Sequence, residues 1–189
     1  MSEQSTAYHE AGHAVMAIDR QVPFNTVSII PDDDSWGRVM SRPLPGSVQP
    51  DINTDARTRR FIENRVMVMY AGGLAQVMIL DKEPEGTSQD NEVTVLLADY
   101  LIGGPQELEA YLSWLYVRVA SALSMPWSHL AIGKNADLLL DERELKQSRV
   151  LRAWRSPSTR PSTPPGTSTR PASARSTCRW AHRSTIRLM

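Results

Sequence analysis

Two histidines that lie four residues apart, His9 and His13, are the part of this sequence best suited to chemistry. On an α-helix, residues four apart project from the same face, so both imidazoles can reach one metal ion. Glu10 follows the first histidine, and its carboxylate can accept a proton from a water molecule bound to that ion. The stretch YHEAGHA at residues 8–14 therefore predicts a hydrolytic zinc site. The alternative is two histidines that share a helix face and bind no metal.

A catalytic zinc site needs a third protein ligand, and several residues are candidates. Asp90 falls in the first turn of an expected helix, where its carboxylate is free to bind metal. It also stands three residues after Thr87, which is the spacing of a capping box, and an acid there complements the helix dipole. The residue types alone leave both roles for Asp90 open. The other candidates are His129, His182, Asp81, Glu92 and Asp99.

The pattern of apolar residues predicts a mainly α fold with one small β hairpin or sheet. Apolar residues at spacings of three and four indicate a helix that carries both histidines. Thr54 and Asp141 are expected helix caps, and proline is expected in the first turn of two later helices. β-Branched residues favour the strands. The expected helices cover about 5–19, 54 onward, 88–101, 105–123, 126–140 and a short stretch from 141, and the expected strands cover 26–31 and 37–40.

Composition divides the chain near Val150. Residues 1–150 contain 13 basic and all 21 acidic residues, whereas residues 151–189 contain 8 arginines and no acid. The first part has the apolar content of one packed domain. The second is rich in Pro, Ser, Thr and Arg and has few apolar residues to bury, so we expect a disordered tail or a non-native extension. Arginine without acid attracts phosphates, but we expect no nucleic acid as a partner of the acidic body.

Other features of the composition bear on the compartment. The single cysteine, Cys178, excludes an internal disulfide framework and a multi-cysteine zinc finger, and it fits a reducing compartment. No basic segment followed by an apolar segment marks a signal peptide at the start of the chain. No stretch reaches the ~18 consecutive apolar residues of a membrane span. The expected location is the cytoplasm.

Four segments together resemble a known family. AYHEAGHAV, then VSIIP with a glycine a few residues later, then AGGLA and GTSQDNEVT occur over residues 6 to about 100. In this order and spacing they resemble the peptidase domain of FtsH-type zinc metalloproteases. The resemblance implies a helical zincin-type domain with Zn²⁺ held by His9, His13 and Asp90, and with Glu10 as general base. It therefore favours Asp90 as a ligand over Asp90 as a helix cap.

The resemblance also implies how substrate binds and which partners to expect. An edge strand beside the cleft would bind extended polypeptide through its backbone, at Thr26–Ile30 or Gly37–Met40. The implied substrate-binding residues are Val27, Ser28, Ile29, Gly37 and Val39. The family couples this domain to an ATPase, but the sequence contains no GxxxxGK[ST] phosphate loop. The resemblance thus leaves open a separate ATPase partner and a homo-oligomer.

One departure concerns the support of the metal ligands. Family members carry an acid pair where this chain has Val77 and Met78, so the groups that orient the histidines are expected to differ. The favoured function is a zinc-dependent metalloendopeptidase that hydrolyses flexible polypeptides without an ATPase of its own. Two alternatives stay open. One is a zinc-bound but inactive module that binds peptides or a partner, and the other is a metal-free helical interaction domain.

Overall fold

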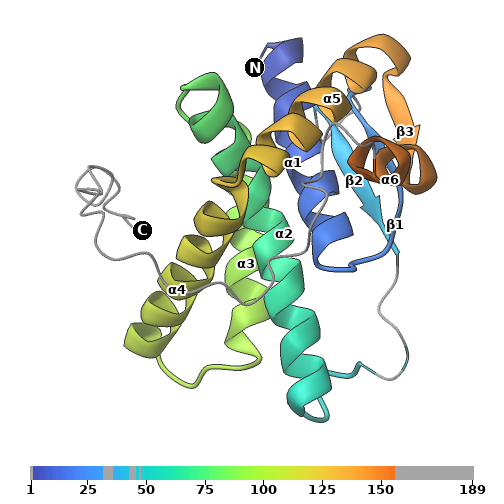
Figure 1. The fold of residues 1–189 in the computed structure, drawn as a ribbon. Coiled ribbons are helices and arrows are strands. Elements are labelled where there is room, and N and C mark those ends of the chain that lie inside the picture. The colour runs from blue at the N-terminus through green and yellow to red at the C-terminus, as the bar shows by residue number, and fades with distance from the viewer. Residues whose placement is uncertain (1, 32–35, 43–45, 47, 156–189) are drawn as a thin grey trace, which may run out of the picture.

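The structure is a computed structural model that describes residues 2–31, 36–42, 46 and 48–155 of the 189-residue chain. Figure 1 shows helices packed around a central N-terminal helix, with a small sheet on one side. The described part of the chain is mainly helical, which confirms the expected fold class. Its elements are α1 (Glu3–Asp19), β1 (Phe24–Ser28), β2 (Arg38–Ser41), α2 (Ala56–Leu80), α3 (Ser88–Asp99), α4 (Pro105–Leu123), α5 (Pro126–Glu142), β3 (Glu144–Lys146) and α6 (Gln147–Arg155).

Helix α1 lies at the centre of the molecule and carries both histidines. Its start is capped by Ser2, whose hydroxyl accepts a hydrogen bond from the backbone N–H of Ser5 at 3.2 Å. It packs mainly against α2 and α5, and its middle turns are buried almost completely. A buried helix can carry polar side chains only where other groups form hydrogen bonds with them. The buried histidines of α1 therefore point to a built site.

Helix α2 runs antiparallel beside α1 and approaches it closely at Gly12 (Figure 1). A Cβ atom at residue 12 would lie only 2.5 Å from the carbonyl oxygen of Ala71 and 2.8 Å from the Cβ of Ala75. Only glycine permits this approach, which brings α2 against the histidine face of α1. The cap of α2 is Asp55, one residue later than expected, and its carboxylate accepts from the Thr58 N–H at 2.8 Å.

The sheet contains three antiparallel strands in the order β2-β1-β3. Strand β1 pairs with β2 through Val27 opposite Val39, and with β3 through Val27 opposite Leu145. We expected this strand over residues 26–31, but it begins earlier, at Phe24, and ends at Ser28. Val27 and Leu145 are buried, so one face of the sheet closes the core.

The end of the described chain corrects one expectation. We expected a short helix capped by Asp141, but α5 continues to Glu142 and ends at Arg143 with φ of 62°. The chain then reverses into β3, and the last helix, α6, starts only at Gln147. This arrangement buries Leu145 against β1, which a further helical turn would not do.

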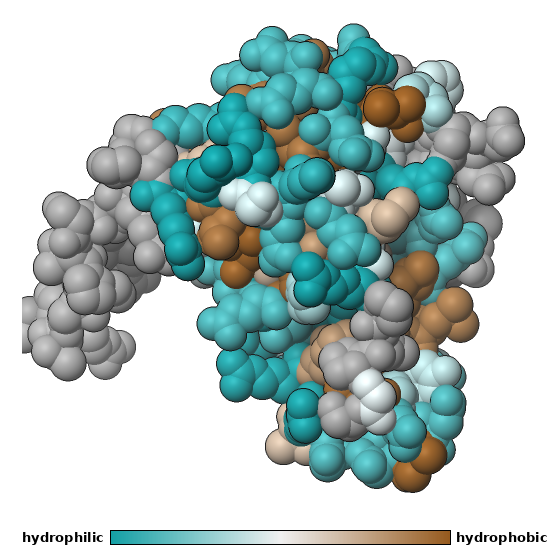
Figure 2. All heavy atoms as spheres, turned by 90° about the vertical axis from the view of Figure 1, so that its right-hand side faces the viewer, coloured by the Kyte–Doolittle hydropathy of each residue, from teal (hydrophilic) through white to brown (hydrophobic). Residues whose placement is uncertain are grey.

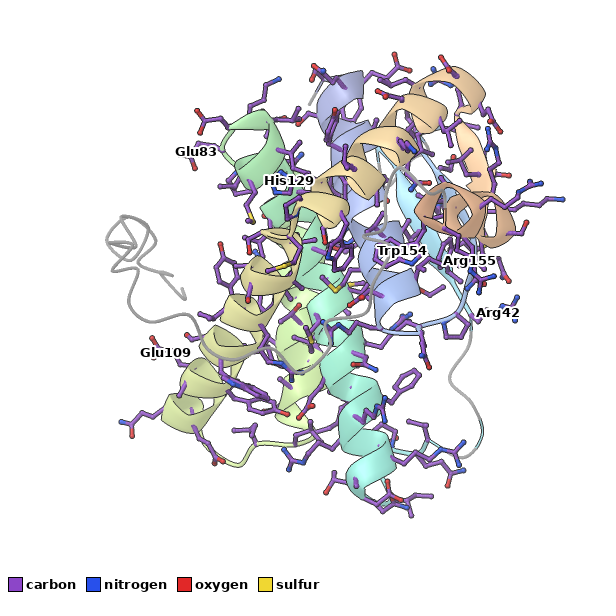
Figure 3. All side chains as sticks on the ribbon, viewed as in Figure 1. Arg42, Glu83, Glu109, His129, Trp154 and Arg155 are labelled. Atoms are coloured by element: carbon purple, nitrogen blue, oxygen red, sulfur yellow. The ribbon has the colours of Figure 1, made fainter. Side chains whose placement is uncertain are left out.

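Helix α6 packs back onto the body of the molecule. Val150 is buried inside it, and Trp154 lies near its end (Figure 3). The ring of Trp154 packs edge-on against Trp127 of α5 with 4.9 Å between ring centroids. The expected domain boundary at Val150 thus falls within a packed helix. The expected tail lies, from residue 156 onward, outside the described residues. No helix in the described part of the chain combines the length and the hydropathy that a membrane span requires. Hydrophilic residues cover most of the face that Figure 2 shows.

Candidate metal centre

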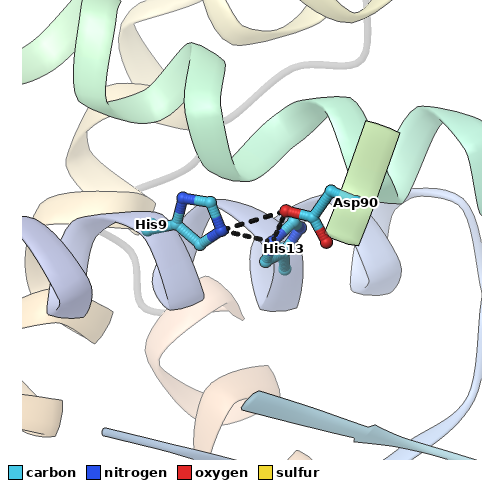
Figure 4. Close-up of side chains that lie close together, drawn as sticks. All are labelled: His9, His13 and Asp90. Atoms are coloured by element: carbon cyan, nitrogen blue, oxygen red, sulfur yellow. Dashed lines mark hydrogen bonds and ion pairs between the residues drawn. The ribbon is translucent and has the colours of Figure 1, made fainter. Parts of the chain in front are cut away.

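The structure brings His9 and His13 of α1 together with Asp90 of α3 (Figure 4). The Nε2 atoms of the histidines lie 2.9 Å apart, and Asp90 Oδ2 lies 3.1 Å from His9 Nε2 and 3.2 Å from His13 Nε2. A zinc ion with tetrahedral bonds of about 2.0–2.1 Å separates its ligand atoms by about 3.3 Å. The three atoms therefore fit around one such ion after adjustments of a few tenths of an ångström.

This cluster stands alone in the part of the chain that the structure describes. No other group of three His, Cys, Asp or Glu side chains there could hold a metal ion. His129 lies on α5 (Figure 3) and is not part of the cluster, and His182 lies outside the described residues. Of the acids considered from the sequence, Asp90 is the one that meets the histidines.

The capping box expected as an alternative role for Asp90 is not formed. Thr87 precedes α3, but its side chain makes no capping hydrogen bond. The carboxylate of Asp90 points instead at the two imidazoles. Asp90 still lies in the first turn of α3, where a negative charge complements the helix dipole. The position thus serves the helix electrostatically while the carboxylate is available as a ligand.

Helix α2 orients both imidazoles through their Nδ1 atoms. His13 Nδ1 lies 2.7 Å from the carbonyl oxygen of Val68, and His9 Nδ1 lies 3.3 Å from Oε1 of Gln76. Both partners are acceptors, so each Nδ1 carries a proton, and each Nε2 has a lone pair whenever its ring is neutral. This tautomer, assigned from the hydrogen bonds, is the one that a metal ligand requires.

Gln76 is the residue that the sequence analysis missed. It is fully buried, its Nε2 donates to the hydroxyl of Ser5 at 2.9 Å, and its Oε1 accepts from the Glu85 N–H at 3.0 Å. It thereby ties α1 and His9 to the segment that leads to Asp90. This neutral amide supports His9. It directly precedes Val77 and Met78, the residues from which we expected the support of the histidines to differ. A single polar residue inside the apolar run AGGLAQVMIL was the available signal.

Glu10 is buried beside the cluster, with 5% of its surface exposed. Burial raises the pKa of Glu10 to about 7; the charge of His13 acts against this and that of Asp90 adds to it. Its Oε2 makes no hydrogen bond within the described residues. Gly37 passes so close that a Cβ there would lie 2.9 Å from Glu10 Cγ. A buried carboxylate with a pKa near neutrality and a free oxygen is suited to accept and return a proton.

The charges within the cluster shift the pKa values of its members. Burial alone would lower the pKa of His13, but the charge of Asp90 and a hydrogen bond to it, together with Glu10, raise that pKa to about 9. Burial and the charge of His13 lower the pKa of His9. Although burial opposes it, contact with both histidines lowers the pKa of Asp90. At neutral pH one proton on His13 therefore occupies the centre of the cluster, where a metal ion would replace it.

Comparison with known proteins identifies the family. Residues 1–102, which include all four of these side chains, match the model of peptidase family M41. The chain belongs to peptidase family M41. It is 34% identical over 101 residues to an ATP-dependent zinc metalloprotease FtsH of Magnetococcus marinus, which covers 52% of this chain and 14% of the relative.

Two further M41 relatives carry the same name. The relative from Photobacterium profundum is 35% identical over 94 residues, which cover 48% of this chain and 12% of the relative. The relative from Haemophilus influenzae is 33% identical over 95 residues, which cover 49% of this chain and 14% of the relative. The chain thus spans about one seventh of the length of the curated relatives it matches. The matched part runs from α1 to the end of α3, so the helices from α4 onward extend beyond it.

The sheet order corrects one of the two strands expected at the substrate edge of this M41 domain. Strand β1 is the central strand, so Val27 and Ser28 already pair on both sides, and the Ile29 N–H donates to the Arg143 carbonyl at 2.9 Å. These residues cannot form an edge. Strand β2 is at the edge of the described sheet, and it continues from Gly37 and contains Val39. The remaining expectation for substrate binding is therefore β2.

Proposed function

We propose that this chain is a zinc-dependent metalloendopeptidase that hydrolyses peptide bonds in unfolded or flexible polypeptides. The observation that carries the proposal is the meeting of His9, His13 and Asp90, whose ligand atoms all lie within 4.8 Å of one another. His9 and His13 have their Nδ1 atoms occupied by acceptors on α2, which leaves Nε2 of each for the ion. Membership in a peptidase family supports the same reading.

His9, His13 and Asp90 would hold zinc through three protein ligands and leave its fourth position open, as catalytic zinc sites do. When bound, zinc polarises the scissile carbonyl and lowers the pKa of a water molecule to near 7. Glu10 takes the proton from the attacking water and passes it to the leaving amine. Burial raises the pKa of Glu10, which makes its carboxylate a better proton acceptor.

Strand β2 would bind the substrate by adding an extended segment to the edge of the sheet. The strand follows directly on Gly37, where an added Cβ would lie 2.9 Å from Glu10 Cγ, so a peptide along β2 would pass near the general base. Backbone hydrogen bonds give affinity with little dependence on sequence. Folded proteins expose few extended segments, so we propose that cleavage of folded substrates needs a separate ATPase partner that unfolds them; the relatives are named as ATP-dependent.

The test combines zinc content with cleavage of an unfolded protein. Wild type should carry about one zinc per chain. Glu10→Gln should keep the zinc and lose about 10²–10⁴-fold in kcat. Asp90→Ala should lose zinc, whereas the matched control Glu92→Ala, an exposed acid one half-turn away on α3, should keep both zinc and activity.

Each outcome separates the proposal from its alternatives. Zinc with peptide binding but no cleavage by wild type would favour an inactive peptide-binding module. Absence of zinc even after reloading would leave a metal-free interaction domain. A Glu10→Gln variant that cleaves as well as wild type would remove Glu10 from the mechanism, and equal zinc in Asp90→Ala and wild type would move the third ligand elsewhere.

A further inference from the structure

A cavity outside the metal centre lies where the end of α1 meets the first turns of α2. A cavity of about 430 Å³ opens there, and its polar wall is formed by Arg20, Arg57 and Arg60. Val22 and Val48, both buried, and the ring of Phe61 supply apolar surface. The volume lies within the range of small-molecule sites, which is about 300–1,000 Å³. None of the described residues that line it is an acid.

The turn after α1, which forms one wall of the cavity, is fixed against α2. Gln21 adopts a left-handed conformation with φ of 58°, and the Val22 N–H returns to the Ala17 carbonyl at 2.8 Å, which fixes the turn after α1. Asn64 of α2 donates from Nδ2 to the Arg20 carbonyl at 3.1 Å. These contacts fix the turn after α1 against α2, so the cavity walls are in place without a ligand.

The two arginines of α2 that line the cavity destabilise the helix that carries them. Arg57 and Arg60 lie one turn apart on the face that also carries Phe61 and Asn64, so their like charges repel. They stand in the first two turns, where the helix dipole disfavours positive charge. The cap residue Asp55 offsets part of the charge beside Arg57. Arg60 has no hydrogen bond or ion pair within the described residues.

The opposite wall of the cavity also carries a positively charged side chain, Arg20. Arg20 Nε lies 3.0 Å from Asp19 Oδ2 but makes no hydrogen bond in this buried position. Arg59, in the same turn of α2, is already engaged, because its guanidinium donates to the Tyr111 hydroxyl at 3.4 Å. Arg20 is thus ion-paired with Asp19, whereas the Arg57 and Arg60 guanidinium groups make no ion pair among the described residues and keep their hydrogen-bonding capacity.

We propose that this cavity binds a small organic oxyanion, a phosphate or carboxylate group carried on an apolar body. Arg57 and Arg60 would bind the oxyanion by charge-assisted hydrogen bonds, with Arg20 across the cavity. The apolar body would lie against Phe61, Val22 and Val48. The site is formed by residues outside the proposed zinc ligands, so it stands whether or not the chain cleaves peptides.

The experiment is a titration of the full 189-residue chain with three probes, followed by heteronuclear NMR or calorimetry. Phenyl phosphate and benzoate carry the two head groups on the same ring, and inorganic phosphate lacks the apolar body. We expect phenyl phosphate or benzoate to bind at least about tenfold more tightly than inorganic phosphate because the ring is buried. Which of the two binds better identifies the head group. Raising the salt concentration should weaken binding.

Variants then locate the site. Arg57→Gln with Arg60→Gln should weaken the preferred probe by about tenfold or more. The matched control Arg152→Gln removes the same charge from an exposed position on α6 and should leave the affinity unchanged within about twofold. Thermal unfolding of each variant shows that the fold is kept. The proposal is overturned if no probe binds at millimolar concentration, or if the double variant binds as wild type does.

Discussion

Gly72 of α2 should be as necessary for zinc binding as a ligand is. A Cβ at residue 72 would lie 2.5 Å from His13 Nε2, 2.6 Å from His13 Cε1 and 2.7 Å from His9 Nε2. Ordinary contacts of a Cβ begin near 3.4 Å, so Gly72→Ala requires the rings to retreat by about 0.7–0.9 Å. Zinc sites tolerate ligand displacements of about 0.2 Å. The rings cannot retreat freely, since Val68 and Gln76 hold their Nδ1 atoms.

We therefore expect Gly72→Ala to weaken zinc binding at least about a hundredfold, or about 2.7 kcal/mol. The measurement is a competition titration of zinc against a chromophoric chelator, with circular dichroism to establish that the variant is folded. The control is Gly133→Ala in α5, where an added Cβ meets nothing within 4 Å. That control should keep zinc and gain about 0.5–1 kcal/mol of stability from the better helix former. A folded Gly72→Ala protein that binds zinc within about twofold of wild type would refute the reasoning.

Three further predictions follow from other contacts of the centre. Gln76→Leu should lower zinc affinity about 10–100-fold and destabilise the fold by about 1–3 kcal/mol in urea unfolding, because the Glu85 N–H loses its acceptor and His9 Nδ1 its partner. Zinc affinity should rise with pH and level off above about 9, because below the raised pKa of His13 the ion must displace a proton. Calorimetry would measure the proton released on binding, and an affinity that stays constant from pH 6 to 9 would contradict the prediction. Gly12→Ala should cost about 1–3 kcal/mol in urea unfolding by forcing α1 away from α2.

The helices and the two histidines were readable from the sequence because they depend on local patterns. The spacing of apolar residues follows the helix period, and proline marks the starts of α4 and α5. Likewise, His9 and His13 share a face of α1 simply because they are four residues apart. Such features need no knowledge of what packs against the helix, so the boundaries of α1 to α5 are predicted to within a few residues, whereas the helix expected from residue 141 begins only at Gln147.

Features set by tertiary packing were missed or left open. The strand Glu144–Lys146 has no β-branched residue, and it forms because Leu145 is buried opposite Val27 of β1. The role of Asp90 was undecided because a cap and a ligand use the same residue at the same position; only the approach of α3 to α1 brings its carboxylate to the histidines. Gln76 looked like one polar residue in an apolar helix until its partners were placed around it.

The contribution of α2 explains why the motif on α1 is not sufficient for a metal site. Val68 and Gln76 set the tautomers, and Gln76 also holds the segment that leads to Asp90. These contacts require α2 to lie closer to α1 than side chains normally permit, and Gly12 and Gly72 are the positions where that approach occurs. Two histidines on a helix that lacked such a neighbour would be free to rotate and to take either tautomer. The second helix therefore turns a shared helix face into a centre with fixed ligand atoms, and glycines at its contact points are as much a requirement of the site as the ligands themselves.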